Sequence, residues 1–475
     1  MFLADFLEIL DRSGELLRVA AEVDADLELA AVSERLARDD GRAIFFERVK
    51  GLRPPVVTNL FGRPSRICQA LGVGRIEEMV DRMTLALGPR EAEGWLDKIR
   101  PVDRPGFSPR TVKSGLCQQV VKLGRDVDLA ELPALRCWPL EQQRSITAGI
   151  LFSRHPETHA RALDSVPSVV LDRDRLGIVW HPYQETYRHQ QATAALGERT
   201  PVAIVLGGDP RYRLVSGTLP SAIDRLHFVG LLCGKPIELV KCRTHDVEVP
   251  ADAEVVIEGF VDPQANPVEI GLVAGSNGHY RLPGSVPVLQ VTAITQRTNP
   301  VWPAIVVGQP PHELTRVEKA IERLLLPLVR QAVPELVDYD LPETGGWQNF
   351  AFVSIRKSLA HQARKVAAAL WGLEQTMFTK FLVIVDEAVD VHDYRQVLTA
   401  LGTNVDPGRD VFFHQGPGWP LDHAASTPLV GHALGIDATA KQPAEHSRAW
   451  PSRLVTSEEV ERLIAGRWAE LRGRQ

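Results

Sequence analysis

The stretch PIELVKCRTHDVEVPADAEVVIEGFVDP, residues 236–263, contains two runs rich in Val and Ile, PIELVKCRT and AEVVIEGFVD. β-Branched side chains favour extended backbone, and the Pro, Gly and Asp residues around these runs favour turns. The stretch therefore predicts two strands. Similar runs elsewhere predict that the centre of the chain is rich in β-structure: SITAGILFSR, VPSVVLDRD, RLGIVWH, PVAIVLGGDP and PVLQVTAITQR.

The segments on either side of this centre mix helix and strand signals. The N-terminal segment MFLADFLEILDRSGELLRV predicts an amphipathic helix that ends near Gly14. Towards the C-terminus a strong helix is expected over Thr315–Leu326, and Pro327 is expected to end or kink it. The later segments FAFVSIRK, SLAHQARKVAAALWGLEQTMF and KFLVIVDEAVD alternate strand, helix and strand, which is typical of a smaller α/β domain.

These patterns predict a mixed α/β protein of three parts. We expect an N-terminal α/β region over residues 1–105, a central β domain over 106–305 and a C-terminal α/β domain over 306–475. The proline-rich segment PVDRPGFSPR, residues 101–110, is expected to be the first linker.

Composition excludes several classes of partner. The 475-residue chain carries a formal net charge of −6, which gives no reason to expect nucleic acid or an anionic membrane as partner. No run of about 18 apolar residues occurs, so no membrane-spanning helix is expected. The chain has five cysteines without a CxxC pair: Cys68, Cys117, Cys137, Cys233 and Cys242. This usage predicts reduced thiols and a cytoplasmic protein.

The segment LGIVWHPYQETYRH, residues 176–189, raises the question of a metal site. His181, Glu185 and His189 are spaced by four residues, so a helix would place all three on one side. The alternative is a partly exposed helix that carries two imidazoles without a metal. Because Pro182 suits the first helical position, His181 would lie outside the regular turns, which favours the alternative.

Short catalytic motifs offer little guidance. GxSxG, HExxH and GxxxxGK[ST] are all absent from the sequence. A group of acids follows the apolar segment FLVIV: Asp386, Glu387, Asp390 and Asp393. Such oxygen ligands suit Mg²⁺ or Mn²⁺, but a solvated loop whose acids cap a helix is the favoured interpretation.

A set of longer segments resembles the UbiD family of decarboxylases. They occur in the family's order and cover most of residues 110–445: PVAIVLGGDP, PIELVKCRTHDVEVPADAEVVIEGFVDP, PVLQVTAITQR, VVGQPP, LLLPLVRQAVPELVDYDLP, VSIRK, ALWGLEQTMFTKFLVIVDEAVDVHDY, TNVDPGRDV, LDHAAS and GIDATAK. The resemblance implies a split β-barrel that binds flavin as the central domain. It also implies oligomerisation segments in the C-terminal domain.

The resemblance further implies a cofactor and a reaction. Members of this family hold a prenylated flavin mononucleotide, whose phosphate is bound by a divalent and a monovalent cation. The flavin acts as an electron sink while an aromatic or unsaturated acid loses CO₂. An arginine and two carboxylates position the substrate and return a proton.

Several of the family's working positions carry other residues in this chain. The metal-binding asparagine, eighteen residues before Trp180, falls on Ala162, and the family arginine falls on Pro167. The position of the metal-binding glutamate falls on Arg225, which cannot bind a metal but could contact a phosphate directly. The resemblance therefore implies that the divalent metal is absent.

Other family positions are retained. Glu269 matches the first carboxylate and is the expected catalytic acid or base, whereas the second carboxylate falls on Ala274 or Gly275. Lys380 matches a lysine near the flavin phosphate. Trp180 and His181 occupy positions where the family chain runs against the cofactor.

The sequence therefore leaves three functions open. The first is a decarboxylase that binds prenylated FMN without metal, with Arg225 and Lys380 on the phosphate and Glu269 as acid or base. The second is an inactive helper subunit or ligand-binding homologue, and the third is a different lyase reaction in the same cleft. We expect a small carboxylic acid as ligand, and a homodimer, a higher oligomer or an assembly with a second UbiD-like subunit.

Overall fold

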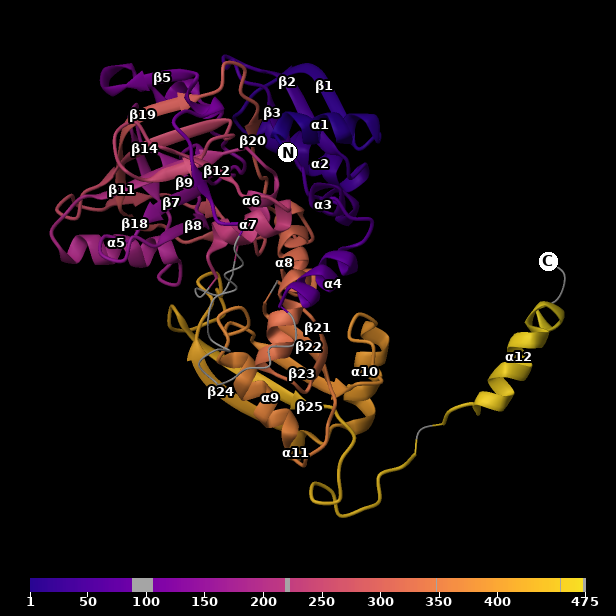
Figure 1. The fold of residues 1–475 in the computed structure, drawn as a ribbon. Coiled ribbons are helices and arrows are strands. Elements are labelled where there is room, and N and C mark those ends of the chain that lie inside the picture. Colours follow the sequence, from indigo (N-terminus) through magenta and orange to yellow (C-terminus); the bar gives the residue numbers. More distant parts are fainter. Residues whose placement is uncertain (88–105, 218–222, 347, 453, 473–475) are drawn as a thin grey trace.

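The computed structural model describes residues 1–87, 106–217, 223–346, 348–452 and 454–472. Helix α8 joins an upper body, made of the N-terminal and central parts, to a lower C-terminal part (Figure 1). The first five residues of the expected linker lie outside the described residues. The overall class is mixed α/β, as predicted.

The N-terminal part is a small sheet covered by helices. Its strands are β1 (Leu16–Val23), β2 (Ala43–Val49), β3 (Val56–Thr58) and β20 (Trp302–Pro303), in that order. Its helices are α1 (Leu3–Arg12), α2 (Glu28–Asp39), α3 (Pro64–Leu71) and α4 (Ile76–Leu87). Helix α1 buries Leu3, Phe6, Leu7 and Leu10, so an apolar side at helical spacing holds it against the core.

The central part is a nine-stranded sheet that curls into a half-barrel (Figure 1), which confirms the predicted split barrel. The strand order is β6-β9-β10-β19-β14-β11-β7-β8, and β5 pairs with β19. The bounds are β5 (Val120–Leu123), β6 (Ser145–Ile146), β7 (Ile150–Arg154), β8 (Arg161–Ser165), β9 (Ser168–Val170), β10 (Arg175–Ile178), β11 (Thr200–Leu206), β14 (Val255–Val261) and β19 (Val288–Gln296).

The two strands predicted from residues 236–263 belong to different sheets. Strand β14 pairs antiparallel with β11 and β19 in the centre of the half-barrel, and its near-continuous burial explains its apolar run. Strand β12 (Glu238–Lys241) instead joins β13 (Glu248–Pro250) and β4 (Arg110–Thr111) in a small separate sheet.

Shorter elements complete the central part. Three helices flank the half-barrel: α5 (Glu185–Ala195), α6 (Arg211–Val215) and α7 (Arg225–Cys233). Two strand pairs project from it: β15 (Val268–Ile270) with β18 (Gly284–Val286), and β16 (Val273–Ala274) with β17 (Tyr280–Arg281). The second pair carries Arg281 towards the site described below.

The C-terminal part is a five-stranded sheet of order β21-β22-β23-β25-β24. Its strands are β21 (Leu336–Asp340), β22 (Phe350–Ile355), β23 (Phe381–Asp386), β24 (Val411–Pro417) and β25 (Val430–Asp437). Its helices are α8 (Glu313–Ala332), α9 (Gln362–Trp371), α10 (Tyr394–Asn404) and α11 (Pro407–Asp410). The acids predicted to cap a helix do so in part, because the Asp393 side chain accepts a hydrogen bond from Arg395 N at the start of α10.

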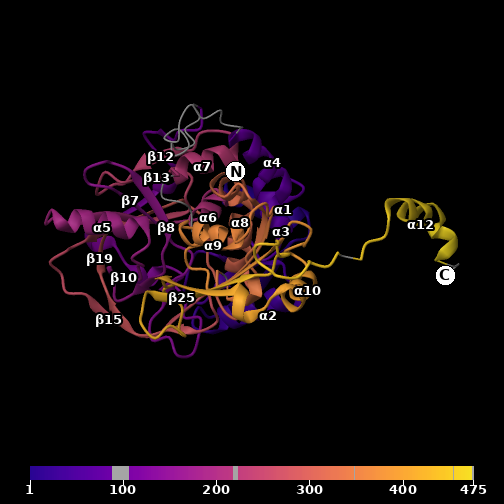
Figure 2. The same ribbon diagram turned by 90° about the horizontal axis from the view of Figure 1, so that it is seen from below.

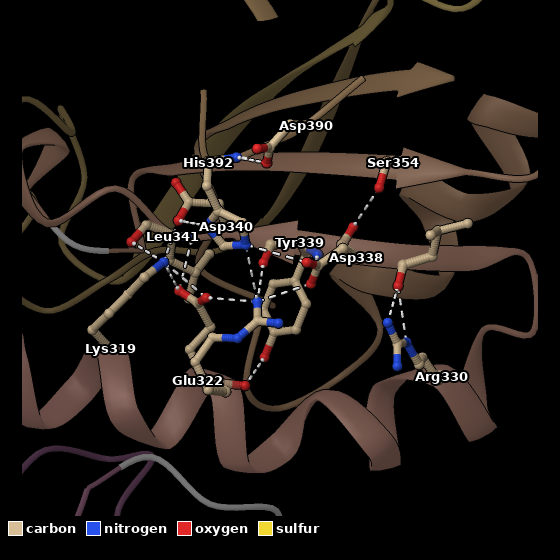
Figure 3. A network of polar contacts seen from close by, with 12 residues as sticks. Lys319, Glu322, Arg330, Asp338, Tyr339, Asp340, Leu341, Ser354, Asp390 and His392 are labelled. Atoms are coloured by element: carbon tan, nitrogen blue, oxygen red, sulfur yellow. Dashed lines mark hydrogen bonds and ion pairs between the residues drawn. The ribbon is translucent and has the colours of Figure 1, made fainter. Parts of the chain in front are cut away.

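A network of charged side chains fixes α8 to this sheet (Figure 3). Arg323 Nη1 lies 2.8 Å from Asp338 Oδ1, and Lys319 forms ion pairs with Glu322 and Asp340. The two ring nitrogens of His392 lie 3.0 Å from Asp340 and 3.2 Å from Asp338. Because several opposite charges meet at one place, α8 and β21 are held in a fixed relation.

Helix α12 (Glu458–Leu471) lies far from the rest of the molecule (Figures 1 and 2). Several of its apolar side chains are exposed: Val460, Leu463, Trp468 and Leu471. Among the described helices, none has both the length and the apolar character that a membrane crossing requires.

Candidate functional site

A cavity of about 240 Å³ lies among the half-barrel, the first half of α8 and loops of the C-terminal part. Part of its wall is apolar, including Val273, Ile305, Val317, Ile321 and Phe378. Charged side chains also reach it: Glu141, Asp164, Glu185, Glu318 and Glu374, and Arg188, Arg213, Arg225 and Arg281. An enclosure that combines apolar wall residues with polar groups is typical of a site for an organic ligand.

Arg225 reaches the cavity from the first turn of α7. The side chain of the preceding Asp224 accepts hydrogen bonds from two backbone N–H groups and so fixes the start of this helix. The Arg225 guanidinium is nearly buried, and its Nη1 lies 3.0 Å from Asp164 Oδ1. Nη1 also donates to the carbonyl of Leu163 at 2.7 Å, so the residue predicted to contact the cofactor lies on the cavity wall.

Asp164 connects Arg225 to Trp180. Its Oδ2 accepts hydrogen bonds from Thr186 N and Thr186 Oγ1, both at 2.8 Å. Trp180 Nε1 in turn donates to Thr186 Oγ1 at 3.0 Å. Trp180 does not line the cavity. Through its hydrogen bond to Thr186 it helps to hold Asp164 in position for the ion pair with Arg225.

His181 and Arg281 form a second polar pair in the wall. Their Nε2 and Nη2 atoms lie 2.7 Å apart, and burial together with the Arg281 charge lowers the pKa of His181 to about 3. The imidazole is therefore neutral and accepts the hydrogen bond. Burial lowers the pKa of Arg281 to about 10, so it stays charged, and its buried Nε has no partner among the described residues. Arg281 is thus a cation with a free donor beside the cavity.

The proposed metal stripe does not form. Helix α5 begins at Glu185 rather than at Pro182, and His181 lies outside it. His189 is buried behind the sheet, where its Nδ1 bonds to Ser153 Oγ at 2.9 Å. The helix is therefore less exposed than predicted at His189, which lies away from the cavity that His181 and Glu185 both line.

Glu269, the predicted catalytic carboxylate, does not reach the cavity. It lies on β15, where alternation turns Glu269 to solvent while Ile270 is buried, and it bonds to Ser285 Oγ. Lys380 also lies outside the wall. Its Nζ binds both carboxylate oxygens of Asp422 at 2.9 Å, next to the wall residue Leu421.

Glu318 is a site residue that the sequence reasoning missed. It faces the cavity from α8, and burial raises its pKa well above the ordinary value, which favours the neutral carboxylic acid. Leu314, Val317, Glu318 and Ile321 follow the helical spacing of one side of α8 and all line the cavity. An acid within an otherwise apolar helical side is the signal that could have identified it.

Arg213 was also missed. It extends from the short helix α6, and its Nη1 donates to Ser165 Oγ at 2.7 Å. Burial lowers its pKa to about 10, so it remains a cation at neutral pH. It adds a third buried positive charge to a wall that already holds Arg225 and Arg281.

Three family models match the chain in succession. They describe the N-terminal, Rift-related and C-terminal domains of 3-octaprenyl-4-hydroxybenzoate carboxy-lyase and cover residues 7–83, 110–310 and 316–438. The chain belongs to the UbiD family. A relative from Aquifex aeolicus (strain VF5), described as an uncharacterized protein, is 38% identical over 477 residues, covering 99% of this chain and 98% of its own.

Solved UbiD-class structures share this fold. The closed form of vanillic acid decarboxylase from Sedimentibacter hydroxybenzoicus has a TM-score of 0.89 at 27% identity, with 99% of both chains covered. The open form of that enzyme gives 0.78 at 26% identity, covering 100% of this chain and 99% of its own. The UbiD-class enzyme HmfF from Pelotomaculum thermopropionicum, in complex with FMN, gives 0.79 at 28% identity, covering 98% and 100%. The chain therefore has the UbiD-class fold over its full length.

Proposed function

We propose that this chain is a non-oxidative decarboxylase of an aromatic or α,β-unsaturated carboxylic acid that uses prenylated FMN. The observation that carries the proposal is the cavity. It combines an apolar wall, buried arginines and a neutral carboxylic acid in a chain that shares the full-length UbiD-class fold. The reverse carboxylation uses the same groups.

The side chains of the wall fit a flavin nucleotide. Apolar groups such as Ile305 and Phe378 suit the ring system, and a phosphate needs cationic donors. Among the described residues, the contacts of Arg225 all use Nη1, so its other N–H groups are left to donate to a phosphate oxygen. Lys380 is a second proposed cation for the phosphate if Asp422 releases it. When bound, the prenylated flavin supplies an electron sink for decarboxylation.

We propose that the phosphate is bound without a divalent metal. Asp164 and Glu185 could supply oxygen ligands from the wall. Arg225, however, lies 3.0 Å from Asp164 and occupies the place where a metal ion would bind beside that carboxylate. In the described part of this cavity, no three ligand atoms of His, Cys, Asp or Glu converge. A guanidinium that is already paired to a carboxylate is the alternative positive group.

Arg281 and Glu318 are the proposed substrate groups. Arg281 has a free Nε–H and a full charge, so it can bind the substrate carboxylate through a charge-assisted hydrogen bond. The carboxylate leaves as CO₂, and its bonding electron pair remains on the substrate carbon. Glu318 donates its proton to that carbon and is then reprotonated from water. It takes the role that the sequence assigned to Glu269.

Closure and assembly complete the proposal. The structure resembles the closed form of the relative more than the open form, with TM-scores of 0.89 and 0.78, and we propose that this chain also alternates between an open and a closed form. An evolved form of HmfF is dimeric, which supports a homodimer or larger assembly here. The five cysteines are all free, in keeping with a cytoplasmic location.

A helper subunit is the second candidate function. It is favoured by the mutual neutralisation of Arg225 and Asp164, because a paired arginine attracts a phosphate less strongly. In that case the chain would assemble with an active UbiD-like subunit. A different lyase reaction in the same cavity remains the third candidate.

Co-expression with a flavin prenyltransferase separates these functions. The purified chain is examined by absorbance, by elemental analysis and by CO₂ release from aromatic and acrylic acids. We expect stoichiometric flavin without stoichiometric Mg²⁺ or Mn²⁺, and release of CO₂. Absence of flavin in every preparation would reject the decarboxylase and favour the helper subunit. Flavin without CO₂ release, together with another elimination product, would favour the different lyase.

The Arg225→Glu variant tests the phosphate contact. Because it places a negative charge beside Asp164 and the cofactor phosphate, we expect loss of bound flavin. Arg188→Glu is the matched control, since Arg188 lines the cavity from the exposed side of α5. Unchanged flavin content in Arg225→Glu would show that Arg225 has no part in phosphate binding.

A further inference from the structure

A second group of chemically active side chains lies outside the cavity. Cys242 and His245 belong to the loop between β12 and β13, and Glu258 lies on β14. One ligand atom of each residue lies within 4.8 Å of the others. None of the three contributes to the wall of the decarboxylase cavity. The group therefore lies outside the proposed decarboxylase site.

The protonation of His245 leaves a nitrogen lone pair free. Its Nε2 lies 3.0 Å from the carbonyl oxygen of Val202, which can only accept, so Nε2 carries the hydrogen. In the neutral ring Nδ1 is then unprotonated. Nδ1 is buried without a partner among the described residues. A backbone carbonyl that holds one nitrogen while the other stays free is the usual second contact of a metal-binding histidine.

Glu258 presents a fixed carboxylate with one free oxygen. Its Oε2 accepts hydrogen bonds from Arg243 N at 2.7 Å, Thr244 N at 2.9 Å and Thr244 Oγ1 at 3.0 Å. Its side chain is 0% exposed, and Oε1 has no partner among the described residues. A buried carboxylate oxygen without a hydrogen-bond donor destabilises the folded protein, and a bound cation would relieve this destabilisation.

We infer that Cys242 Sγ, His245 Nδ1 and Glu258 Oε1 form a site for a divalent ion of the zinc class. One thiolate, one imidazole and one carboxylate match the ligands that Zn²⁺ prefers, and water would supply the fourth. Zinc–ligand bonds of about 2.0–2.3 Å place tetrahedral ligand atoms about 3.3–3.8 Å apart, so a small contraction closes the site.

The ion would link two sheets. Cys242 and His245 follow the last residue of β12 in the small sheet, whereas Glu258 lies in the middle of the half-barrel. His245 also packs edge-on against Phe260, with ring centroids 5.4 Å apart, which fixes the ring plane. A bound ion would therefore stabilise the attachment of the small sheet to the central domain.

Cobalt binding to the full-length protein tests the site. The purified chain is treated with a chelator, dialysed and titrated with Co²⁺, and then with Zn²⁺ in competition. We expect one ion per chain, a thiolate-to-cobalt charge-transfer band, and displacement of Co²⁺ by Zn²⁺. Cys242→Ser should abolish the band, and His245→Asn should weaken binding at least tenfold. Cys68→Ser, which removes a buried thiol from α3 instead, should bind as the wild type does.

Thermal unfolding provides a readout that does not depend on the flavin. Zn²⁺ should raise the unfolding temperature of the wild type and of Cys68→Ser but not that of His245→Asn. His245 is partly exposed, so this variant should keep the wild-type circular dichroism spectrum. Failure to bind one ion, or equal binding by the wild type, Cys242→Ser and His245→Asn, would overturn the inference. Loss of flavin binding with retained cobalt binding would reject only the proposed function.

Discussion

Glu318 shows how one side chain can acquire a function from its surroundings. On an exposed helix this carboxyl would be ionised at neutral pH, but burial on the cavity side of α8 raises its pKa well above the ordinary value. Glu318 thus shares the cavity wall with Arg213, Arg225 and Arg281 while its environment favours the protonated, uncharged form. A neutral carboxylic acid in a water-poor site is suited to donate a proton to carbon.

The Glu318→Gln variant should retain the flavin and lose turnover. Glutamine keeps the shape but has no acidic proton, so we expect a decrease in kcat of about 10²–10⁴-fold. In the wild type, activity should fall as pH rises through the raised pKa, and this limb should be missing in the variant. Glu318→Asp, which keeps a titratable group, should recover part of the rate. Equal pH profiles in the wild type and Glu318→Gln would rule out the acid role.

His181 should make the fold sensitive to acid. Its folded-state pKa of about 3 lies below the ordinary value of 6.5. The stability that it contributes is therefore complete above about pH 6.5 and is lost as pH falls towards 3. When the pH is lowered from about 6.5 to 3, we expect the free energy of unfolding to fall less in His181→Gln than in the wild type. Denaturant unfolding at a series of pH values measures the difference, which should be absent if His181 is protonated in the folded state.

At the scale of elements, strands were easier to predict than the end of a helix. The run AEVVIEGFVD identified β14 because both of its sides are buried. Pro327 was expected to end or kink α8, but the helix continues to Ala332. Leu324, Leu325 and Val329 are buried around this position, so their packing offsets the hydrogen bond that proline cannot make. The sequence alone does not reveal that side-chain packing compensates for the missing backbone hydrogen bond.

The network between α8 and β21 should weaken in alkali. The hydrogen bonds that the ring donates to Asp338 and Asp340 raise the pKa of His392 to about 9. Its contribution to stability is therefore complete below about pH 6.5 and is lost as pH rises through about 9. His392→Gln should remove this loss, whereas the exposed His414→Gln should not. Unfolding temperatures between pH 6 and 10 measure the effect, and identical slopes in all three proteins would contradict it.

At the scale of the whole molecule, the site combines segments that are far apart in the sequence. Arg225 and His181 were predicted near the cofactor from the family resemblance, and both line the cavity. Arg281 and Glu318 reach it through the β16–β17 pair and through α8, and a single sequence does not reveal which elements meet. Glu269 was misplaced because a matching motif does not fix the side of a strand to which a residue points.

The separation of α12 leads to a test at the same scale. The hydrophobic clusters of the described structure contain no residue from 454–471. Removing residues 454–475 should therefore change the unfolding temperature by less than about 2 °C, or under about 1 kcal/mol. Removing residues 1–12 is the control, and it should lower the temperature strongly because α1 buries Phe6 and Leu10. Calorimetry measures the unfolding temperatures of both deletion variants. Equal decreases would contradict the conclusion that α12 lies outside the hydrophobic core.

Helix α8 carries Glu318 on one side, while the next residue, Lys319, and Glu322 anchor it to the C-terminal sheet. Around Glu318, however, Val317, Ala320 and Ile321 pack in the core of the N-terminal and central parts, whereas Leu326 and Val329 of the same helix pack in the C-terminal core. Under the proposed closure the acid would therefore keep its position relative to the half-barrel, and the moving groups would be the C-terminal loops that supply Phe378 and Trp419 to the wall. A substrate in the open molecule would then meet both the cations and the acid, and closure would serve to remove water from around them.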